Sequence, residues 1–274
     1  MKYKTIGKIK IPTLGLGTWG IGGKAEKDLS QKSYSIKAIR KAIELGITHI
    51  DTSEFYAEGF TEELIGEAIN PYKRANLFLT SKVWTNHLTY AGVIDALKST
   101  LKRLKTDYLD LYLIHRPSAN MDLKGTIEAL EYLNAKGTVR AIGLSNFTVE
   151  QILEAEKYLK ESEISAIQDE YNLLKRQEKI LEFCKQRNIA FIAYRPLMRG
   201  DIVKDEIDIL KKLAEKYGKT NAQIALNWLI SKDNVVAIPK SAKLEHLQEI
   251  SESIGWKMSD EDYESLNNLN LEQK

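Results

Sequence analysis

The chain lacks the features that are typical of disulfide-bonded, metal-binding and membrane proteins. It has one cysteine in 274 residues, Cys184, so no disulfide can form within it. Its four histidines are not spaced like metal ligands, so we expect no metal site. No apolar run reaches the roughly 18 residues of a membrane span, and the N-terminus lacks the apolar segment of a signal peptide. We therefore expect a cytoplasmic protein without a membrane anchor.

Neither sign of charge dominates. The chain carries 40 Lys and Arg against 38 Asp and Glu, a net charge of +2, and the charges are dispersed. This pattern does not favour binding to nucleic acid or to an anionic membrane. With 43% hydrophobic residues the chain can bury a large core, and we expect residues 1–274 to form a single domain and a monomer. Cys184 follows Leu181 at helical spacing and is predicted to be a buried apolar side chain.

Residues 15–20, GLGTWG, have the G-x-G-x-x-G spacing of a dinucleotide-binding turn. That turn needs a helix starting at the third glycine. Residues 21–28 instead hold two more glycines and four charges, and the first helical pattern begins near Ser30. The motif is therefore interpreted as the end of a strand and not as a Rossmann turn.

Short β-rich runs alternate with amphipathic helical runs along the chain. Eight strands are predicted, at Thr13–Gly17, Thr48–Thr52, Leu77–Val83, Leu109–His115, Val139–Ser145, Ala166–Asp169, Ala190–Tyr194 and Val235–Pro239. Eight such units favour a (β/α)8 TIM barrel, with a doubly wound sheet as the alternative. Tyr3–Ile11 is predicted to form an N-terminal β-hairpin, and extra helices are expected near Thr220 and over Asp260–Leu269.

The predicted strands end in polar residues, where a barrel carries its chemistry. Asp51, Lys82 and His115 stand at the ends of three consecutive strands, and Tyr56 follows in the loop after Asp51. A lysine facing a barrel interior is costly to bury unless it is paired, and Asp51 is the predicted partner. A purely structural ion pair remains the alternative at this point. His49 shares a strand face with Asp51 and is predicted to be a core residue.

Eight segments in register resemble the aldo-keto reductase family over nearly the whole chain. They are LGLGTW at 14–19, DTSEFY at 51–56 with GEAI at 66–69, SKVW at 81–84, HRP at 115–117, GLSNF at 143–147, Gln168 with EYN at 170–172, AYRPL at 193–197 and IPKSAKLEHL at 238–247. The resemblance implies reduction of aldehydes and ketones, small or sugar-derived, by a nicotinamide cofactor. It also implies that the dinucleotide binds without a Rossmann fold.

The resemblance implies a catalytic tetrad of Asp51, Tyr56, Lys82 and His115. A carbonyl that accepts hydride develops alkoxide charge and needs a proton donor. Tyr56 is assigned as this general acid, and the ammonium of Lys82 is expected to lower its pKa. Asp51 would keep Lys82 charged, and His115 would hydrogen-bond the substrate oxygen.

The resemblance also implies sites for NADP(H), with NAD(H) as a second possible cofactor. The predicted cofactor contacts are Ser145, Asn146 and Gln168 for the carboxamide, Tyr194 for the nicotinamide ring, Arg195 and Arg199 for the pyrophosphate, Lys240 and Ser241 for the 2′-phosphate, and also Pro196, Leu197, His246 and Glu249. Asn146 alternatively caps the helix that begins near Thr148.

The substrate pocket is expected to include Trp19, Phe55, Trp84 and Arg116. Arg116 either admits an anionic group of the substrate or faces solvent. Two rival functions stay open, a Schiff-base lyase acting through Lys82 and a non-catalytic NADP(H)-binding regulatory subunit.

The residues at the expected 2′-phosphate site predict weak discrimination between cofactors. His246 stands where many relatives have arginine, and a mostly neutral imidazole cannot form a guanidinium fork with phosphate. Ile250 replaces an asparagine that contacts adenine in many relatives. We expect NADPH to bind more tightly than NADH, by a small margin. Fluorescence titration of both cofactors measures this, and NADH binding as tightly as NADPH would contradict it.

Overall fold

Eight parallel strands form a barrel in the computed structural model, which describes residues 2–204 and 207–269. They are β3 (Gly15–Gly17), β4 (His49–Asp51), β5 (Phe78–Val83), β6 (Leu111–Ile114), β7 (Ile142–Ser145), β8 (Ile164–Glu170), β9 (Ala190–Tyr194) and β10 (Val235–Ile238). Each strand pairs with the next along the chain. The order confirms the predicted barrel, and the doubly wound sheet is wrong.

The barrel closes where the first and last strands meet. Gly17 donates its backbone N–H to the carbonyl of Pro239 at 2.9 Å, and Ala237 donates to Thr13 at 3.1 Å. Leu14 also forms a parallel bridge with Ala237. Closure gives the edge strands partners, as a barrel requires.

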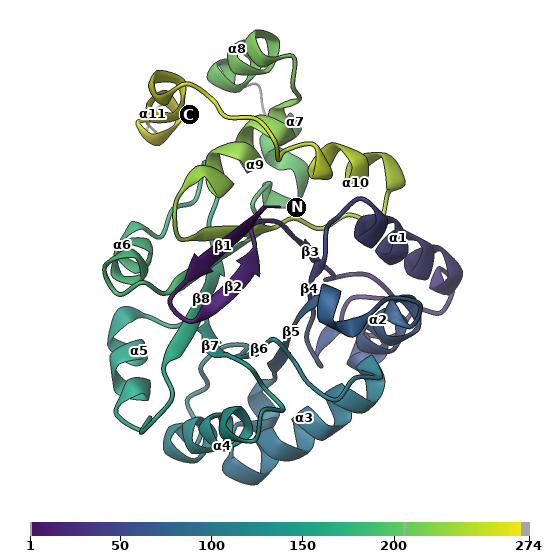
Figure 1. The fold of residues 1–274 in the computed structure, drawn as a ribbon, viewed down its shortest axis with the longest axis vertical. Helices are drawn as coiled ribbons and strands as arrows, with labels where there is room; N and C mark the ends of the chain where they lie inside the picture. The colour runs from purple at the N-terminus through teal and green to yellow at the C-terminus, as the bar shows by residue number, and fades with distance from the viewer. Residues whose placement is uncertain (1, 205–206, 270–274) are drawn as a thin grey trace.

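Helices surround the barrel of strands (Figure 1). Six follow β3 to β8: α1 (Lys32–Glu44), α2 (Phe60–Ile69), α3 (Tyr90–Leu104), α4 (Leu123–Ala135), α5 (Val149–Glu156) and α6 (Glu178–Gln186). The two extra helices predicted near the C-terminal end are present as α9 (Asn221–Ser231) and α11 (Asp260–Asn267). The structure also has α7 (Asp201–Lys204), α8 (Asp208–Tyr217) and α10 (Leu244–Ser251). Single 3-10 turns lie at η1 (Tyr56–Gly59), η2 (Arg74–Asn76), η3 (Thr85–His87) and η4 (Met198–Gly200).

Threonine side chains fix the starts of two helices. Thr148 before α5 and Thr220 before α9 each form a capping box with a glutamine three residues later. Thr148, and not Asn146, therefore caps α5, so the capping alternative for Asn146 is wrong.

The predicted N-terminal hairpin lies across one end of the barrel and packs against side chains that point into its interior. It consists of β1 (Tyr3–Ile6) and β2 (Ile9–Pro12), joined by Gly7 and Lys8 (Figure 1). Its three isoleucines, Ile6, Ile9 and Ile11, form one cluster with inward-facing residues of the strands, among them Leu111, Leu113, Ile192 and Val236. A second cluster fills the space between the strands and the helices. The hairpin thus closes the end of the barrel where the strands begin. The polar residues lie at the other end, where the strands finish.

The first two glycines of GLGTWG are required by close packing. A Cβ at Gly15 would lie 2.7 Å from Nδ1 of His49, and one at Gly17 would lie 2.8 Å from the carbonyl oxygen of Ile238. The residues after Gly20 form a turn-rich loop, not a helix. The motif is thus the end of a barrel strand, as interpreted from the sequence.

His49 and Cys184 are core residues, as predicted. His49 is fully buried, and its Nε2 lies 3.0 Å from the hydroxyl of Thr80. Burial, aided by the charge of Lys82, lowers the pKa of His49 to about 3. Burial raises the pKa of the Cys184 thiol to about 12, so this side chain is unreactive. None of the helices in the described ranges has both the length and the hydropathy that crossing a bilayer requires.

Replacing Gly17 should loosen the closure of the barrel. We expect Gly17→Ala to lower the free energy of unfolding by about 2–3 kcal/mol, because its methyl group meets a backbone carbonyl that cannot move freely. Gly218→Ala is the control, since that glycine has a positive φ but open space around it. The control should lose only about 1 kcal/mol. Urea unfolding measures both, and an equal loss in the two variants would contradict the packing account.

Candidate active site

A buried ion pair lies at the carboxyl end of the barrel. Lys82 on β5 places its Nζ 2.5 Å from Oδ1 of Asp51 on β4, and the two side chains are 1% and 3% exposed. The same ammonium donates to the carbonyl of Thr52 at 2.8 Å. Adjacent parallel strands bring the two residues together, since Asp51 pairs with Thr80, two residues before Lys82. The pairing predicted from the sequence is therefore present.

Its surroundings keep Lys82 charged. Burial lowers the pKa of its ammonium, but the neighbouring Asp51 and Tyr56 outweigh burial and raise the pKa above its usual value. The three N–H donors of the ammonium have three acceptors: Asp51, the Thr52 carbonyl and the Tyr56 hydroxyl. A protonated and fully hydrogen-bonded lysine is a poor nucleophile.

The phenol of Tyr56 completes this group of polar atoms. Its hydroxyl lies 3.5 Å from Nζ of Lys82, and its side chain is 9% exposed. Burial raises the pKa of Tyr56 above its usual value, and the charge of Lys82 only partly offsets this effect. The expected net lowering of the pKa is therefore wrong, because the hydroxyl is more buried than its loop position suggested. The phenol is held in its protonated form.

Three consecutive left-handed residues shape the turn after Tyr56. Ala57, Glu58 and Gly59 have φ values of 50°, 57° and 84°. Such conformations cost about 1–3 kcal/mol each in a non-glycine residue and persist where the surroundings impose them. Here the N–H of Ala57 donates to the carbonyl of Lys24 at 2.7 Å, in the loop after β3. That loop therefore helps to hold Tyr56 over the barrel.

His115 stands beside these groups in an aromatic enclosure. Its ring meets Trp84, Tyr56 and Phe55 edge-on, with centroids 4.8, 5.7 and 6.3 Å away. Burial, followed by the charges of Lys82 and Arg116, lowers the pKa of His115 to about 2. The imidazole is therefore neutral at physiological pH. All four residues of the predicted tetrad meet at one place.

Aromatic side chains form a wall on one side of this centre. Phe55 stacks on Trp84 with centroids 3.9 Å apart and on Trp19 at 6.0 Å. Trp19 also meets the ring of Tyr56 edge-on at 5.0 Å. The guanidinium of the exposed Arg116 lies 5.1 Å from the centroid of Trp84. The four predicted substrate residues thus lie together.

The predicted carboxamide residues form one hydrogen-bonded chain with the ends of the strands. Asn146 donates to the carbonyl of His115 at 2.9 Å and to the hydroxyl of Ser145 at 3.0 Å, and it accepts from Tyr194 at 2.8 Å. Gln168 donates its amide N–H to Oδ2 of Asp51 at 2.8 Å, which leaves its oxygen as an acceptor. Tyr194 is thus a half-buried aromatic surface fixed through its hydroxyl, which suits a flat ring such as nicotinamide.

The segment after β9 has an unusual backbone. Arg195, Met198 and Arg199 have φ values of 47°, 47° and 59°. The guanidinium of Arg195 lies 3.4 Å from Glu170, so it is partly engaged by an acid. Arg199 is exposed on η4, Pro196 is buried and Leu197 is half-buried.

A second cation influences Lys240, where the 2′-phosphate was predicted. Burial lowers the pKa of Lys240, and the positive charge of Lys24 lowers it further. Two ammonium groups in mutual repulsion suit an anion such as phosphate. Sequence reasoning missed Lys24, because its loop carries no motif that indicates its position.

The remaining predicted contacts lie on and before α10. The hydroxyl of Ser241 accepts from the N–H of Lys243 at 3.1 Å. Glu249 accepts from the hydroxyl of Thr220 at 2.5 Å, and His246 is exposed on the same helix. Glu249 is therefore held by the start of α9.

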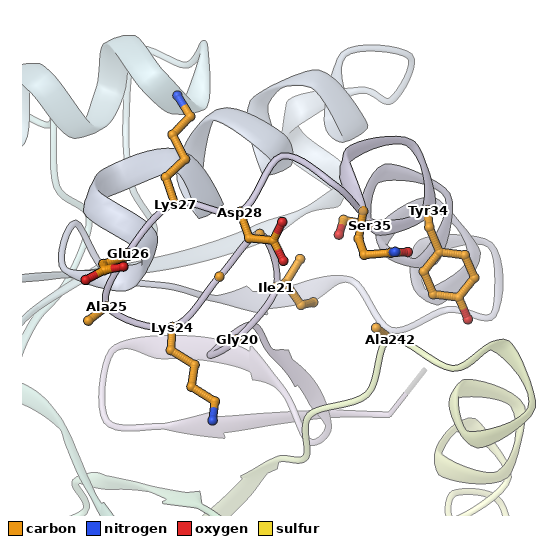
Figure 2. Close-up of a pocket in the computed structure, with 13 residues that line it drawn as sticks. Gly20, Ile21, Lys24, Ala25, Glu26, Lys27, Asp28, Tyr34, Ser35 and Ala242 are labelled. Carbon is orange, nitrogen blue, oxygen red and sulfur yellow. The ribbon is translucent and has the colours of Figure 1, made fainter.

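A hollow of about 690 Å³ lies beside this region. The loop of residues 20–28 and the first turns of α1 line it, with Ala242 at its edge (Figure 2). Lys24 and Lys27 extend to opposite sides of the loop in Figure 2. Lys27 pairs with Glu63 at 3.7 Å, so it is tied to α2. In the part of the chain that the structure describes, no three His, Cys, Asp or Glu side chains are grouped so as to hold a metal ion.

Comparisons with known proteins identify the family of the chain. The model of the Aldo/keto reductase family matches residues 13–271. Methylglyoxal reductase YeaE of Escherichia coli is 35% identical over 250 residues, covering 89% of this chain and 85% of its own length. The thermostable aldo-keto reductase Tm1743, solved with the inhibitor epalrestat, is 41% identical, with a TM-score of 0.94 over 98% of this chain and all of its own. A Klebsiella pneumoniae aldo/keto reductase, solved with NADP and acetate, is 33% identical, with a TM-score of 0.87 over 98% of this chain and 95% of its own.

Breaking the buried ion pair from one side should destabilise the protein. Lys82→Met leaves the carboxylate of Asp51 buried without its cation, and we expect a loss of about 3–5 kcal/mol in the free energy of unfolding. Lys82→Met combined with Asp51→Asn removes both charges and keeps an amide near Gln168, so it should recover most of that loss. Urea unfolding of the three proteins measures the effect. A single variant as stable as the wild type would contradict the account.

Proposed function

The chain belongs to the aldo/keto reductase family, whose members are NAD(P)H-dependent oxidoreductases, and we propose that it reduces small aldehydes and ketones to alcohols with NADPH. The observation that carries the proposal is the convergence of one phenol, one ammonium and one imidazole beside an aromatic wall. The hydroxyl of Tyr56 lies 3.5 Å from the ammonium of Lys82, and the ring centroids of Tyr56 and His115 are 5.7 Å apart.

Tyr56 is the proposed general acid. Its phenol is protonated in the resting protein, because burial raises its pKa. Negative charge that develops on the carbonyl oxygen during reduction draws the phenolic proton to that oxygen. The ammonium of Lys82 then stabilises the phenolate that remains, and this stabilisation grows as the proton leaves. Asp51 holds that ammonium charged and in place.

His115 and the aromatic wall would position the substrate. A neutral imidazole can donate one hydrogen bond to the carbonyl oxygen, without adding a second acid. Trp19, Phe55 and Trp84 bound the space from one side and favour a small, partly apolar carbonyl compound. A related protein is named as a methylglyoxal reductase, which agrees with a small substrate. Arg116, on the face of Trp84, would meet any anionic group that the substrate carries.

The cofactor would extend from the tetrad across the ends of β7 to β10. NADPH supplies the hydride when it is bound. Ser145, Asn146 and Gln168 would hold the carboxamide, and Tyr194 would stack on the nicotinamide ring. The segment of Arg195, Pro196, Leu197 and Arg199 would cover the pyrophosphate. Lys240, Ser241, His246 and Glu249 would surround the adenosine end, and the charge of Lys24 adds to that of Lys240 there.

The geometry does not favour the rival functions. A Schiff-base lyase needs a neutral amine, whereas Lys82 is an ammonium with its donors in use. A purely regulatory NADP(H)-binding subunit would not need Tyr56 to be held against Lys82 by a strained turn.

Removing one hydroxyl tests the proposed acid. We expect Tyr56→Phe to lower kcat by about 10²–10⁴-fold across a panel of aldehydes and ketones, followed by the absorbance of NADPH. Binding of NADPH should change little.

Tyr112→Phe is the matched control, because the Tyr112 hydroxyl is buried on β6 without a hydrogen-bond partner. That variant should keep wild-type activity. Full activity in Tyr56→Phe would show that another group donates the proton.

A further inference from the structure

A buried carboxylate joins the two loops that carry the aromatic wall. Glu54 stands one residue before Phe55 in the loop after β4, and its side chain is 8% exposed. Its Oε1 accepts a hydrogen bond from the backbone N–H of Trp84, the first residue after β5, at 2.5 Å. The rings of Phe55 and Trp84 stack with their centroids 3.9 Å apart. The residue before one ring therefore binds the backbone of the other.

This bond continues the pairing of β4 with β5. The backbone N–H of Glu54 donates to the carbonyl of Lys82 on β5 at 3.4 Å. Backbone groups two residues apart along a strand point toward the same neighbouring strand, so the N–H of Trp84 also faces the loop after β4. The side chain of Glu54 accepts that N–H in place of a strand carbonyl. The pairing thus reaches one residue further, to the residue that carries the wall.

The ring of His87 contacts the same carboxylate. Its Nδ1 lies 3.0 Å and 3.1 Å from the two oxygens of Glu54. A carboxylate offers only acceptors, so Nδ1 of His87 is the donor. His87 follows Trp84 by three residues, and its backbone N–H donates to the carbonyl of Trp84 at 3.0 Å. Glu54 therefore holds both ends of the turn at η3.

We propose that Glu54 is a positioning residue that fixes the aromatic wall for the substrate by clamping Trp84 against Phe55. The effect on reduction rests on the proposed function, whereas the clamp, formed by the two hydrogen bonds of the carboxylate, does not. Both rings are half-buried, so packing alone leaves them free to turn toward solvent. The clamp fixes the backbone of Trp84, and with it the ring on which the guanidinium of Arg116 lies.

A fixed wall acts on binding more than on the chemical step. In the proposed reaction the wall contacts the substrate equally before and during hydride transfer, whereas Tyr56 and Lys82 act on the charge that develops. An interaction that is equal in the two states changes KM and leaves kcat unchanged. The change should grow with the area that the substrate places on the wall, so it should be larger for an aromatic aldehyde than for a three-carbon carbonyl compound.

Amide hydrogen exchange at Trp84, followed by NMR, reads the clamp without any reaction. We expect Glu54→Ala to speed the exchange of this N–H by about tenfold, because its acceptor is lost. Glu54→Gln keeps an acceptor oxygen and should restore slow exchange. Glu128→Ala is the matched control, since this half-buried glutamate on α4 lies outside the site and pairs with Lys124. It should exchange as the wild type does.

Kinetics with benzaldehyde and methylglyoxal give the second readout. At saturating NADPH, Glu54→Ala should raise the KM for benzaldehyde about five- to tenfold and that for methylglyoxal by less than about twofold, with kcat and the KM for NADPH unchanged. Glu54→Gln and Glu128→Ala should match the wild type.

The two readouts separate the possible failures. Exchange at Trp84 that stays slow in Glu54→Ala would overturn the proposal, and so would faster exchange with an unchanged KM. A loss confined to kcat would place Glu54 in the chemical step and would also overturn it. Faster exchange in Glu54→Ala, in a protein without reductase activity, would support the clamp and refute only the proposed function.

Discussion

The contact between Lys82 and Asp51 is the constraint on which the site depends. An ammonium can stay charged inside a barrel only with a carboxylate at hydrogen-bond distance, here 2.5 Å. In the proposed reaction that charge would allow the adjacent phenol to release its proton, because burial raises the pKa of Tyr56 and the charge of Lys82 opposes this effect. The ammonium of this ion pair would thus stabilise the phenolate that forms when Tyr56 loses its proton. The same ion pair keeps the amine of Lys82 protonated, so that it cannot act as a nucleophile.

The rest of the fold serves to hold these few atoms in place. Parallel strands put Asp51, Lys82 and His115 at one end of the barrel, while the N-terminal hairpin fills the other end with isoleucines. The pairing of β3 with β4 brings the loop after β3 against the turn that carries Tyr56, where the carbonyl of Lys24 accepts a hydrogen bond from the N–H of Ala57. The loop that carries Lys24 therefore also supports Tyr56.

The sequence predicted the barrel, because alternating strands and helices form a regular pattern. The strand ends placed Asp51, Lys82 and His115 together, whereas the tetrad with Tyr56 was implied by the family resemblance. Strand positions were right to within a few residues, and side chains that alternate along β5 placed Lys82 inside. The net rise in the pKa of Tyr56 was missed, since it depends on how deeply the turn at Ala57 buries the hydroxyl. Glu54 was also missed, since its bond to Trp84 spans 30 residues and no spacing rule indicates it. Lys24 influences the pKa of Lys240 across 216 positions of the chain, and no spacing rule indicates that either.

The central claim is that the buried ion pair drives proton donation by Tyr56. The most direct measurement is the single-turnover rate of aldehyde reduction at saturating NADPH in Lys82→Met combined with Asp51→Asn, after circular dichroism has shown that the variant is folded. The account predicts a rate at least about a hundredfold below that of the wild type, because the phenolate loses its stabilising charge. A rate within a few-fold of the wild type would contradict it.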